Sequence, residues 1–386
     1  MIDLIEYVVG ELKSKRLSAT NAAALVRQVS FHSSSVFASS VLHPLLHRNT
    51  SDLNEQSYSS TFTGEEFFLK DHQVRVKDDR VQKVLPGVAY LEMVRAAVEQ
   101  AWPGRPESRV LELRDTVWAR PIVVSEAKQI SIALLPKDEE EIEFEVYSRE
   151  AEEEIVHCQG RVVWGHQPPA ARLDLDELKG RMGQGQMEPG SIYTAFERMG
   201  IVYGPAFQGV EAIHRGNGEV LARLRLPDAA AGDCEVYLLH PALLDSALQA
   251  CIGLVNGPLE DSANQPKMPF ALEGLRIISA CSRVMFAWVR YAAGSKGTDK
   301  VVKLDVDLCD GSGNVCAEIR GFSSRALKNE QEAPSHPRED MAAGLQLFVP
   351  AWSPVLPEAN ENTLPTQSKR LLLVAGNKAV LEWAQQ

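Results

Sequence analysis

Short runs in which apolar and polar residues alternate, rich in β-branched side chains, dominate the chain between about residues 38 and 328. The clearest runs are Gln129–Leu135, Ile142–Tyr147 and Ile155–Trp164. A period of two with β-branched residues is typical of strands in an antiparallel sheet. The pattern therefore predicts a protein built mainly of short antiparallel strands.

Two strongly helical segments interrupt these strands. The first follows Pro86-Gly87 and extends from Val88 to about Ala101, and the second follows His240-Pro241 and extends from Ala242 to about Val255. Both have an apolar stripe at helical spacing, and a proline at the start suits the first turn of a helix. Each helix is followed by several strands, so we expect two α+β halves, each with a sheet wrapped around one helix.

The flanking segments differ in pattern from this central region. Residues near the start have apolar positions at helical spacing, broken by a capping signal at Ser18, and predict two short amphipathic helices that serve either as a linker or as a docking element. Polar, proline-bearing residues follow the central region, and then Leu347–Trp352 and the apolar run Leu371–Asn377 begin a new pattern without a complete fold behind it. The expected organisation is a helical linker or docking segment at 1–30, an N-terminal half at 38–165, a linker at 166–189 rich in Gly, Pro and charge, a C-terminal half at 190–328, an interdomain linker at 329–345 and the truncated start of another domain at 346–386.

Composition narrows the possible functions. A formal net charge of -12 offers no basic surface suited to a phosphate backbone, so nucleic acid is not an expected partner. The six cysteines are scattered without the spacing of a zinc site, and we expect reduced thiols and no bound metal. The first residues lack a basic stretch followed by a long apolar one, and no later run reaches the roughly 18 to 20 apolar residues of a membrane span. We therefore expect a cytoplasmic protein without a membrane span.

Two residues could perform acid–base chemistry. His72 lies between apolar, strand-like residues shortly before the Pro86-Gly87 helix start, and Asp245 lies in the first turn of the otherwise apolar second helix. Gln249 is four residues further on, so its amide is on the same helix face and can orient the carboxyl group. Burial raises the pKa of such an aspartate, whereas the helix N-terminus favours the anion. Taken singly, His72 is also consistent with a core or surface histidine, and Asp245 with a carboxylate that complements the helix dipole.

A third segment, Val202–Gly209, combines glycines, a proline and the aromatic residues Tyr203 and Phe207. Gly204-Pro205 predicts a fixed turn, and Gly209 would allow backbone or substrate to approach closely. By itself the segment predicts only a rigid loop.

Together these segments resemble the dehydratase domains of modular type I polyketide synthases, particularly of the kind whose acyltransferase acts in trans. That family shows HxxxGxxxxP, YGPxFQ and HPxxxDxxxQ/H motifs in this order, and the second and third are complete at Tyr203–Gln208 and His240–Gln249. The likeness covers about residues 40 to 328 and includes Leu42–Leu46 and Leu85–Met93. It implies a double hotdog fold, in which two antiparallel sheets each wrap around a long central helix.

The resemblance also implies the chemistry. It makes His72 the catalytic base, Asp245 the acid, Gln249 the residue that orients the acid, and Tyr203 a hydroxyl near the leaving group, with Phe207 and Gly209 beside the substrate. Backbone N–H groups around Gly87 and Val88, next to Pro86, would meet the thioester carbonyl, because donors at a helix start are unpaired.

The implied reaction is dehydration of a 3-hydroxyacyl thioester to a 2,3-unsaturated thioester. The domain itself would bind no metal or nucleotide cofactor, and the substrate would be carried on the phosphopantetheine of an acyl carrier protein. Neighbouring ketoreductase and ketosynthase domains are expected partners, and residues 346–386 look like the start of a ketoreductase structural subdomain. The family likeness further implies a homodimer.

The first motif departs from the family pattern. The family has eight residues between its histidine and proline, whereas residues 73–85 place 13 between His72 and Pro86, and none of them is glycine. The extra residues lie within the charged stretch Arg75–Arg80. They represent either a surface insertion in a hairpin or a reshaped pocket. The second possibility leaves open a dehydratase-like domain that forms a pyran or furan ring or shifts a double bond, and a third possibility is a non-catalytic scaffold.

Overall fold

The computed structural model describes residues 41–326 except 54, 77–79, 104–108, 138–139, 151–152, 167–170, 233 and 255–266. The predictions for 1–30, 329–345 and 346–386 lie outside the described residues. Within the described part, the cysteines at all six positions are free thiols.

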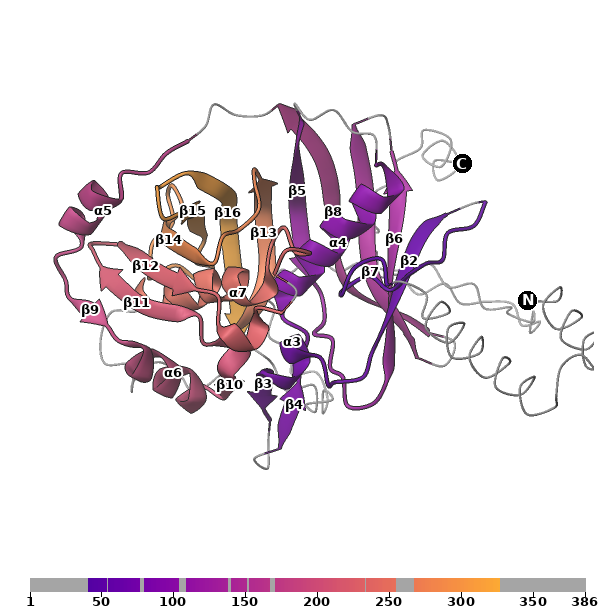
Figure 1. The fold of residues 1–386 in the computed structure, drawn as a ribbon, viewed down its shortest axis with the longest axis horizontal. Coiled ribbons are helices and arrows are strands. Elements are labelled where there is room, and N and C mark those ends of the chain that lie inside the picture. Colours follow the sequence, from indigo (N-terminus) through magenta and orange to yellow (C-terminus); the bar gives the residue numbers. More distant parts are fainter. Residues whose placement is uncertain are drawn as a thin grey trace, which may run out of the picture. The chain divides into compact units, whose positions relative to one another are not determined.

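Antiparallel strands form a long sheet around two helices, as predicted (Figure 1). The strands of this sheet follow the order β1-β2-β6-β7-β8-β5-β13-β16-β15-β14-β12-β11-β9. The strands on the β1 side of the order come from the N-terminal half and those from β13 onward come from the C-terminal half. The two halves join where β5 (Arg109–Trp118) pairs with β13 (Lys267–Ile277), with Leu113 opposite Leu275.

The other strands of the long sheet alternate in direction with their neighbours throughout the described part. Their bounds are β1 Arg48–Asn49, β2 Gln56–Phe62, β6 Lys128–Pro136, β7 Glu141–Glu150, β8 Glu153–His166, β9 Gln186–Met187, β11 Val210–Arg215, β12 Glu219–Arg225, β14 Val284–Tyr291, β15 Leu304–Asp310 and β16 Val315–Ala326. The three strands predicted from the alternating pattern correspond to β6, β7 and β8.

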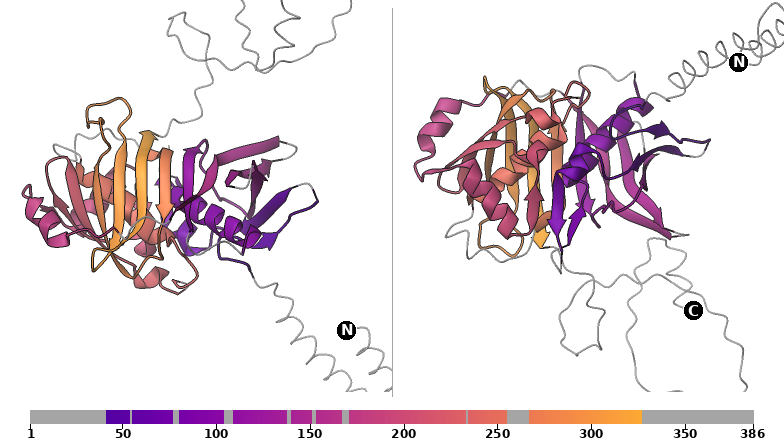
Figure 2. Two further views of the ribbon diagram at one scale, coloured as in Figure 1. Left: turned by 90° about the horizontal axis from the view of Figure 1, so that it is seen from above. Right: turned by 60° about the horizontal axis from the view of Figure 1, so that its bottom comes forward.

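Each half holds one central helix. Helix α4 (Gly87–Ala101) lies against the N-terminal strands, and helix α7 (Pro241–Gln249), extended by the 3-10 turn η4 (Ala250–Leu254), lies against the C-terminal strands on the same side of the sheet (Figures 1 and 2). Residues 88–98 of α4 and all residues of α7 except Leu248 are buried, as expected for helices that a sheet surrounds. The predicted double hotdog arrangement is therefore present.

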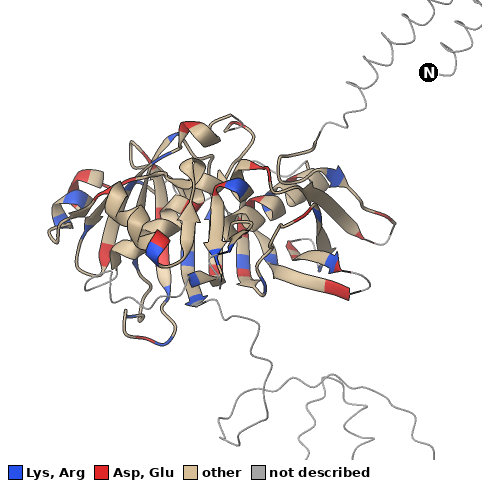
Figure 3. Ribbon diagram, turned by 90° about the horizontal axis from the view of Figure 1, so that it is seen from below, with Lys and Arg blue, Asp and Glu red and all other residues tan. Residues whose placement is uncertain are grey.

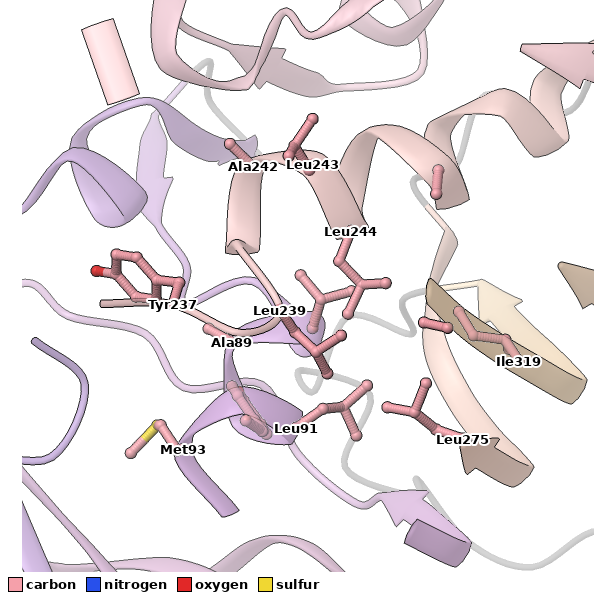
Figure 4. Packing of buried hydrophobic residues seen from close by; sticks show 14 of the residues in the cluster. Ala89, Leu91, Met93, Tyr237, Leu239, Ala242, Leu243, Leu244, Leu275 and Ile319 are labelled. Atoms are coloured by element: carbon pink, nitrogen blue, oxygen red, sulfur yellow. The ribbon is translucent and has the colours of Figure 1, made fainter. Parts of the chain in front are cut away.

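The core between the two helices is apolar. Leu91 of α4, Leu244 of α7 and the strand residues Leu275 and Ile319 gather around Leu239 (Figure 4). The fully buried Glu92 carboxylate accepts hydrogen bonds from the backbone N–H groups of the segment that enters α7, at Leu238 and Leu239 (both 3.0 Å). Through these contacts α4 holds the start of α7.

A smaller three-stranded sheet lies beside the long one. It has the order β10-β3-β4 and is formed by β3 (His72–Arg75), β4 (Val81–Lys83) and β10 (Ile201–Tyr203). The short helix α3 (Phe67–Lys70) leads into β3, and the 3-10 turn η2 (Pro205–Phe207) follows β10. A further 3-10 turn, η3 (Asp228–Ala230), lies between β12 and α7.

The segment expected to link the halves contains regular structure. Helix α5 (Leu175–Arg181) begins at an N-cap where Asp174 accepts from the N–H groups of Asp176 and Glu177, and Leu178 packs in a small cluster with Phe286 of β14. Helix α6 (Pro189–Arg198), which the sequence analysis did not predict, follows β9. The boundary at 166–189 remains a prediction.

Positively and negatively charged residues are interspersed along the strands (Figure 3). Arg276 pairs with Glu318 of the adjacent strand (2.8 Å), and Asp307 pairs with both Arg290 (2.8 Å) and Arg320 (2.6 Å). These charges neutralise each other locally. Among the described residues, no helix is long and apolar enough to cross a membrane.

Candidate active site

His72 is buried at the start of β3, and its hydrogen bonding fixes which ring nitrogen carries a proton. Nδ1 lies 2.7 Å from the carbonyl oxygen of Val84. A carbonyl oxygen only accepts, so Nδ1 donates its hydrogen and Nε2 of the neutral ring keeps a free lone pair. The imidazole is thus held in the form that can accept a proton through Nε2.

The sheet register brings Tyr203 beside His72. In the antiparallel β10–β3 pair Tyr203 lies directly opposite His72, and the two rings are 5.6 Å apart in an edge-to-face arrangement. Phe207, fully buried in η2, also packs edge-to-face with His72, at 5.5 Å between the ring centroids. Two aromatic side chains of the YGPxFQ segment therefore enclose the histidine.

Asp245 is buried on α7, with only 8% of its surface exposed. The helix begins at Pro241 with His240 as its N-cap, so Asp245 is the fifth helical residue. The sequence analysis had placed it in the first turn, whereas it lies just beyond that turn. That prediction was wrong because it did not recognise that the His240 side chain caps the helix by accepting from the N–H of Ala242 (3.2 Å). The dipole of the helix end weakens beyond the first turn.

Burial dominates the electrostatics of Asp245. Desolvation raises the pKa of its carboxyl group above the ordinary value, against the opposing influences of His72, of the Gln249 amide and of the Tyr203 hydroxyl. The pKa of Tyr203 is likewise held well above its usual range, first by burial and then by the Asp245 charge. His72, Asp245, Tyr203 and Gln249 thus form one interacting group of side chains.

Gln249 lies one turn after Asp245, as its spacing predicted. Its Nε2 donates to Oδ2 of Asp245 (2.8 Å) and to the carbonyl oxygen of Phe207 (3.0 Å). On the other side of the amide, the hydroxyl of Tyr193 donates to Oε1 (3.3 Å). The side-chain amide is therefore held at both ends.

Asp71 connects the histidine strand with the loop after Tyr203. Its carboxylate accepts from the N–H of Ala206 (2.7 Å), and its carbonyl oxygen accepts from the N–H of Gly204 (2.8 Å). A Cβ on Gly204 would lie 2.5 Å from this carboxylate, so only glycine fits there. The residue before His72 thereby fixes the loop that encloses it.

Helix α4 begins at Gly87 after Pro86, the residues that the sequence analysis expected to lie near the substrate carbonyl. The first N–H groups of a helix have no partner within the helix, so those of Gly87 and Val88 are available as donors. The indole of Trp118 donates to the Gly87 carbonyl (3.0 Å), and the ring of Pro269 lies so close that a Cβ on Gly87 would meet it at 2.8 Å. Only two residues separate this helix start from Val84, the partner of His72.

Gly209 packs against protein and not against open space. A Cβ there would lie 2.5 Å from the Oγ of Ser246, the residue after Asp245, and 2.9 Å from the backbone oxygen of Arg225. The close approach foreseen for Gly209 is therefore an approach of backbone to α7.

The charged stretch after His72 lies in the connection of a hairpin. Strands β3 and β4 pair up to Arg75 opposite Val81, and the N–H of Val76 donates to the carbonyl oxygen of Arg80 (2.8 Å). His72 is at the other end of β3, so the connection begins about 10 Å along the strand from the base. This position supports the surface-insertion interpretation. Residues 77–79 lie outside the described part.

The sequence analysis missed Tyr193 and Asp71. A signal existed for Tyr193, because Pro189 and the apolar residues Ile192 and Phe196 mark a helix that carries it. For Asp71 the sequence offered no signal beyond its position directly before His72. Across the part of the chain that the structure describes, no group of His, Cys, Asp and Glu is arranged to hold a metal ion.

Comparisons with known proteins define the class. A family model described as the polyketide synthase dehydratase domain matches residues 43–149, and one described as the polyketide synthase dehydratase N-terminal domain matches residues 170–334. A solved dehydratase domain of a trans-acyltransferase polyketide synthase from Brevibacillus brevis is 44% identical, with a TM-score of 0.69 over 74% of this chain and 99% of that chain. The chain belongs to the polyketide synthase dehydratase family, whose members are hydro-lyases that act on 3-hydroxyacyl thioesters.

Individual relatives agree with this assignment. The polyketide synthase PksM of Bacillus subtilis (strain 168) is 40% identical over 349 residues, which make up 88% of this chain and 8% of that protein. The chain therefore spans less than a tenth of the length of this relative. The CurK dehydratase was solved as an inactive mutant with a histidine replaced by phenylalanine, and it is 25% identical with a TM-score of 0.66 over 74% of this chain and 99% of that chain.

Proposed function

We propose that this chain dehydrates a 3-hydroxyacyl thioester with His72 as base and Asp245 as acid. Nε2 of His72 removes a proton from C2, and the electron pair of that C–H bond forms the double bond between C2 and C3. The C3–O bond breaks, and the hydroxyl leaves as water with the proton of Asp245. The products are a 2,3-unsaturated thioester, one water, a protonated histidine and an aspartate anion, which exchange a proton to restore the starting state.

One observation supports these roles above all others: a buried carboxyl group with a raised pKa interacts with a histidine whose free nitrogen is Nε2. An acid must keep its proton until the leaving group takes it, and burial raises the pKa of Asp245 in the direction that this role requires. A base must offer a lone pair, and the bond from Nδ1 of His72 to Val84 leaves Nε2 as the nitrogen that can do so. The inactive CurK mutant that lacks a histidine supports a catalytic histidine in this fold.

The start of α4 is proposed to bind the thioester carbonyl. When the proton leaves C2, negative charge develops on the carbonyl oxygen, and the N–H groups of Gly87 and Val88 can stabilise it together with the positive end of the helix. Pro86 fixes the backbone before these donors, and Phe207 lies beside His72, while Gly209 supports the site by letting its backbone pack against Ser246 of α7. Tyr203 stabilises the departing hydroxyl together with Asp245.

The substrate is proposed to arrive on the phosphopantetheine arm of an acyl carrier protein, and both proton transfers use side chains without a cofactor. We further propose that the domain works within a longer, homodimeric synthase in the cytoplasm, beside ketosynthase and ketoreductase domains. The 8% share of PksM that this chain spans is consistent with one domain of such a synthase.

A combined mass and absorbance assay tests the reaction class. The chain is incubated with both epimers of a 3-hydroxyacyl carrier protein, including a substrate with a remote hydroxyl group. Dehydration predicts loss of the mass of one water and the appearance of the absorbance of a conjugated enoyl thioester. If the enoyl absorbance fails to persist only for the substrate that carries the remote hydroxyl group, the chain catalyses cyclisation. If the double bond of the product lies at another position, the chain catalyses isomerisation. No change with either epimer indicates a scaffold and contradicts the proposal.

A further inference from the structure

The hydroxyl of Tyr193 takes part in a chain of hydrogen bonds that begins and ends on the backbone. The N–H of Val210 donates to the Tyr193 oxygen (2.9 Å), and the Tyr193 oxygen is 3.3 Å from Oε1 of Gln249. Nε2 of Gln249 lies 3.0 Å from the carbonyl oxygen of Phe207 and 2.8 Å from Oδ2 of Asp245. Tyr193 comes from α6, and Gln249 comes from α7.

The backbone groups at the ends determine the direction of every bond. The N–H of Val210 can only donate, so the Tyr193 oxygen accepts there and its own hydrogen is free to point to Gln249. The carbonyl oxygen of Phe207 can only accept, so the Gln249 atom beside it must be the nitrogen. Both constraints give the same orientation of the amide, with Oε1 toward Tyr193 and Nε2 toward Asp245.

This orientation has a consequence for the acid. Because Nε2 of Gln249 donates its second hydrogen to Oδ2 of Asp245, that oxygen serves as an acceptor. The hydroxyl oxygen of a neutral carboxyl group is a weaker acceptor than its carbonyl oxygen, so this bond favours the proton on Oδ1. A reversed amide would present Oε1 to the carboxyl group, which could donate its proton to the amide instead of to the leaving hydroxyl.

We propose that Tyr193 is a positioning residue for the acid: it holds the Gln249 amide so that Oδ2 of Asp245 stays an acceptor and the proton stays on Oδ1 for the leaving group. This inference rests on the proposed function, because it concerns the same acid. Tyr193 acts only through Gln249 and is not a catalytic residue. Its substitution should therefore change the protonation behaviour and turnover of the acid more than the binding of substrate.

The test is the pH profile of dehydration by Tyr193→Phe, which removes one oxygen atom. Without the hydroxyl, Oε1 loses its donor, the amide is less firmly held, and its donation to the carboxylate weakens. The anion of Asp245 is then less stabilised, so the basic limb of the kcat profile should move to higher pH. We expect kcat to fall about 10-fold, which is the effect expected from the loss of one buried hydrogen bond. KM should change less than about twofold, because Tyr193 does not contact the substrate.

Tyr90→Phe is the matched control. The buried Tyr90 hydroxyl accepts from the N–H of Ile122 (2.9 Å), so its loss removes the same kind of backbone bond without touching Gln249. Both variants should unfold at a somewhat lower temperature, but Tyr90→Phe should keep the basic limb of the wild type.

The outcomes separate this proposal from the proposed function. If wild type dehydrates the substrate and only Tyr193→Phe shows the raised basic limb, the positioning role is supported. If Tyr193→Phe matches Tyr90→Phe in both stability and pH profile, or matches wild type, the positioning role is refuted while dehydration stands. If wild type does not dehydrate any epimer, it is the proposed function that fails.

Discussion

Replacing Gly209 by alanine should displace Asp245, the proposed acid, without removing any catalytic group. The new Cβ would stand 2.5 Å from Oγ of Ser246 and 2.9 Å from the backbone oxygen of Arg225, whereas ordinary contacts begin at 3.4 Å. Ser246 or the loop has to retreat by about 0.9 Å to reach an ordinary contact. Such overpacking costs about 1–3 kcal/mol of unfolding free energy, which corresponds to a fall in Tm of roughly 3 to 10 °C.

The same displacement should slow the reaction, because Ser246 follows Asp245 on α7. A misplacement near 1 Å costs up to about 100-fold in rate, so we expect kcat to fall roughly 10- to 100-fold in Gly209→Ala. The assays are thermal unfolding and single-turnover water loss. Gly180→Ala in α5 is the matched control, since a Cβ there meets nothing within 4 Å, and it should be stabilising by about 0.5–1 kcal/mol.

A double-mutant cycle with Ser246→Ala tests whether the clash is the cause. Alone, Ser246→Ala loses the bond from Oγ to the carbonyl oxygen of Ala242 (2.7 Å), at a cost of about 1 kcal/mol. Combined with Gly209→Ala, it also removes the nearest clashing atom, so the double variant should be more stable than the sum of the two losses by about 1 kcal/mol or more. Losses that add within about 0.5 kcal/mol would refute the reasoning.

Three other predictions concern stability and the hairpin. Asp245→Asn should raise Tm at pH 8, because burial raises the pKa of this carboxyl group and its anion therefore destabilises the fold above that pKa. Differential scanning calorimetry should show the gain shrinking as the pH falls and the carboxyl group becomes neutral, and a gain that does not change with pH contradicts this cause. Burial lowers the pKa of His157 from 6.5 to about 4, so the unfolded chain takes up a proton that the folded protein refuses, and the unfolding free energy should fall by up to about 3 kcal/mol from pH 6.5 to 4. Urea titrations should show a smaller fall in the unfolding free energy for His157→Gln than for the wild type. An identical fall in both proteins would contradict the role of His157. Replacing residues 76–80 by Asn-Gly, which suits a two-residue turn between paired Arg75 and Val81, should keep the rate of water loss within about threefold; a much larger loss would mean that the insertion shapes the pocket.

The sequence predicted those parts of the fold that local pattern determines. The strands at β6, β7 and β8 follow from alternation, and the starts of α4 and α7 follow from Pro86-Gly87 and His240-Pro241. Two features join the halves: the β5–β13 pairing and the bonds from Glu92 to the start of α7. Both depend on contacts between residues that are distant in the sequence, so no local pattern predicts them.

The candidate site shows the same division. The spacing of Asp245 and Gln249 predicted their contact, because four residues make about one helical turn. The pairing of His72 with Tyr203, by contrast, depends on the register of β3 and β10. The two residues are 131 positions apart in the sequence, and the resemblance to the family implied their pairing only indirectly. The role of Tyr193 depends on the direction of four hydrogen bonds, which only the folded backbone defines.

Water loss from a 3-hydroxyacyl thioester on its carrier protein, followed by intact mass in single turnover, tests the central claim most directly. The measurement compares wild type with His72→Ala and Asp245→Asn, all shown to be folded by their thermal unfolding. We predict that the wild type removes one water from one epimer and that each variant is slower by at least about 100-fold, as expected for loss of an acid or base. Water loss at the wild-type rate in either variant would contradict the assignment of base and acid.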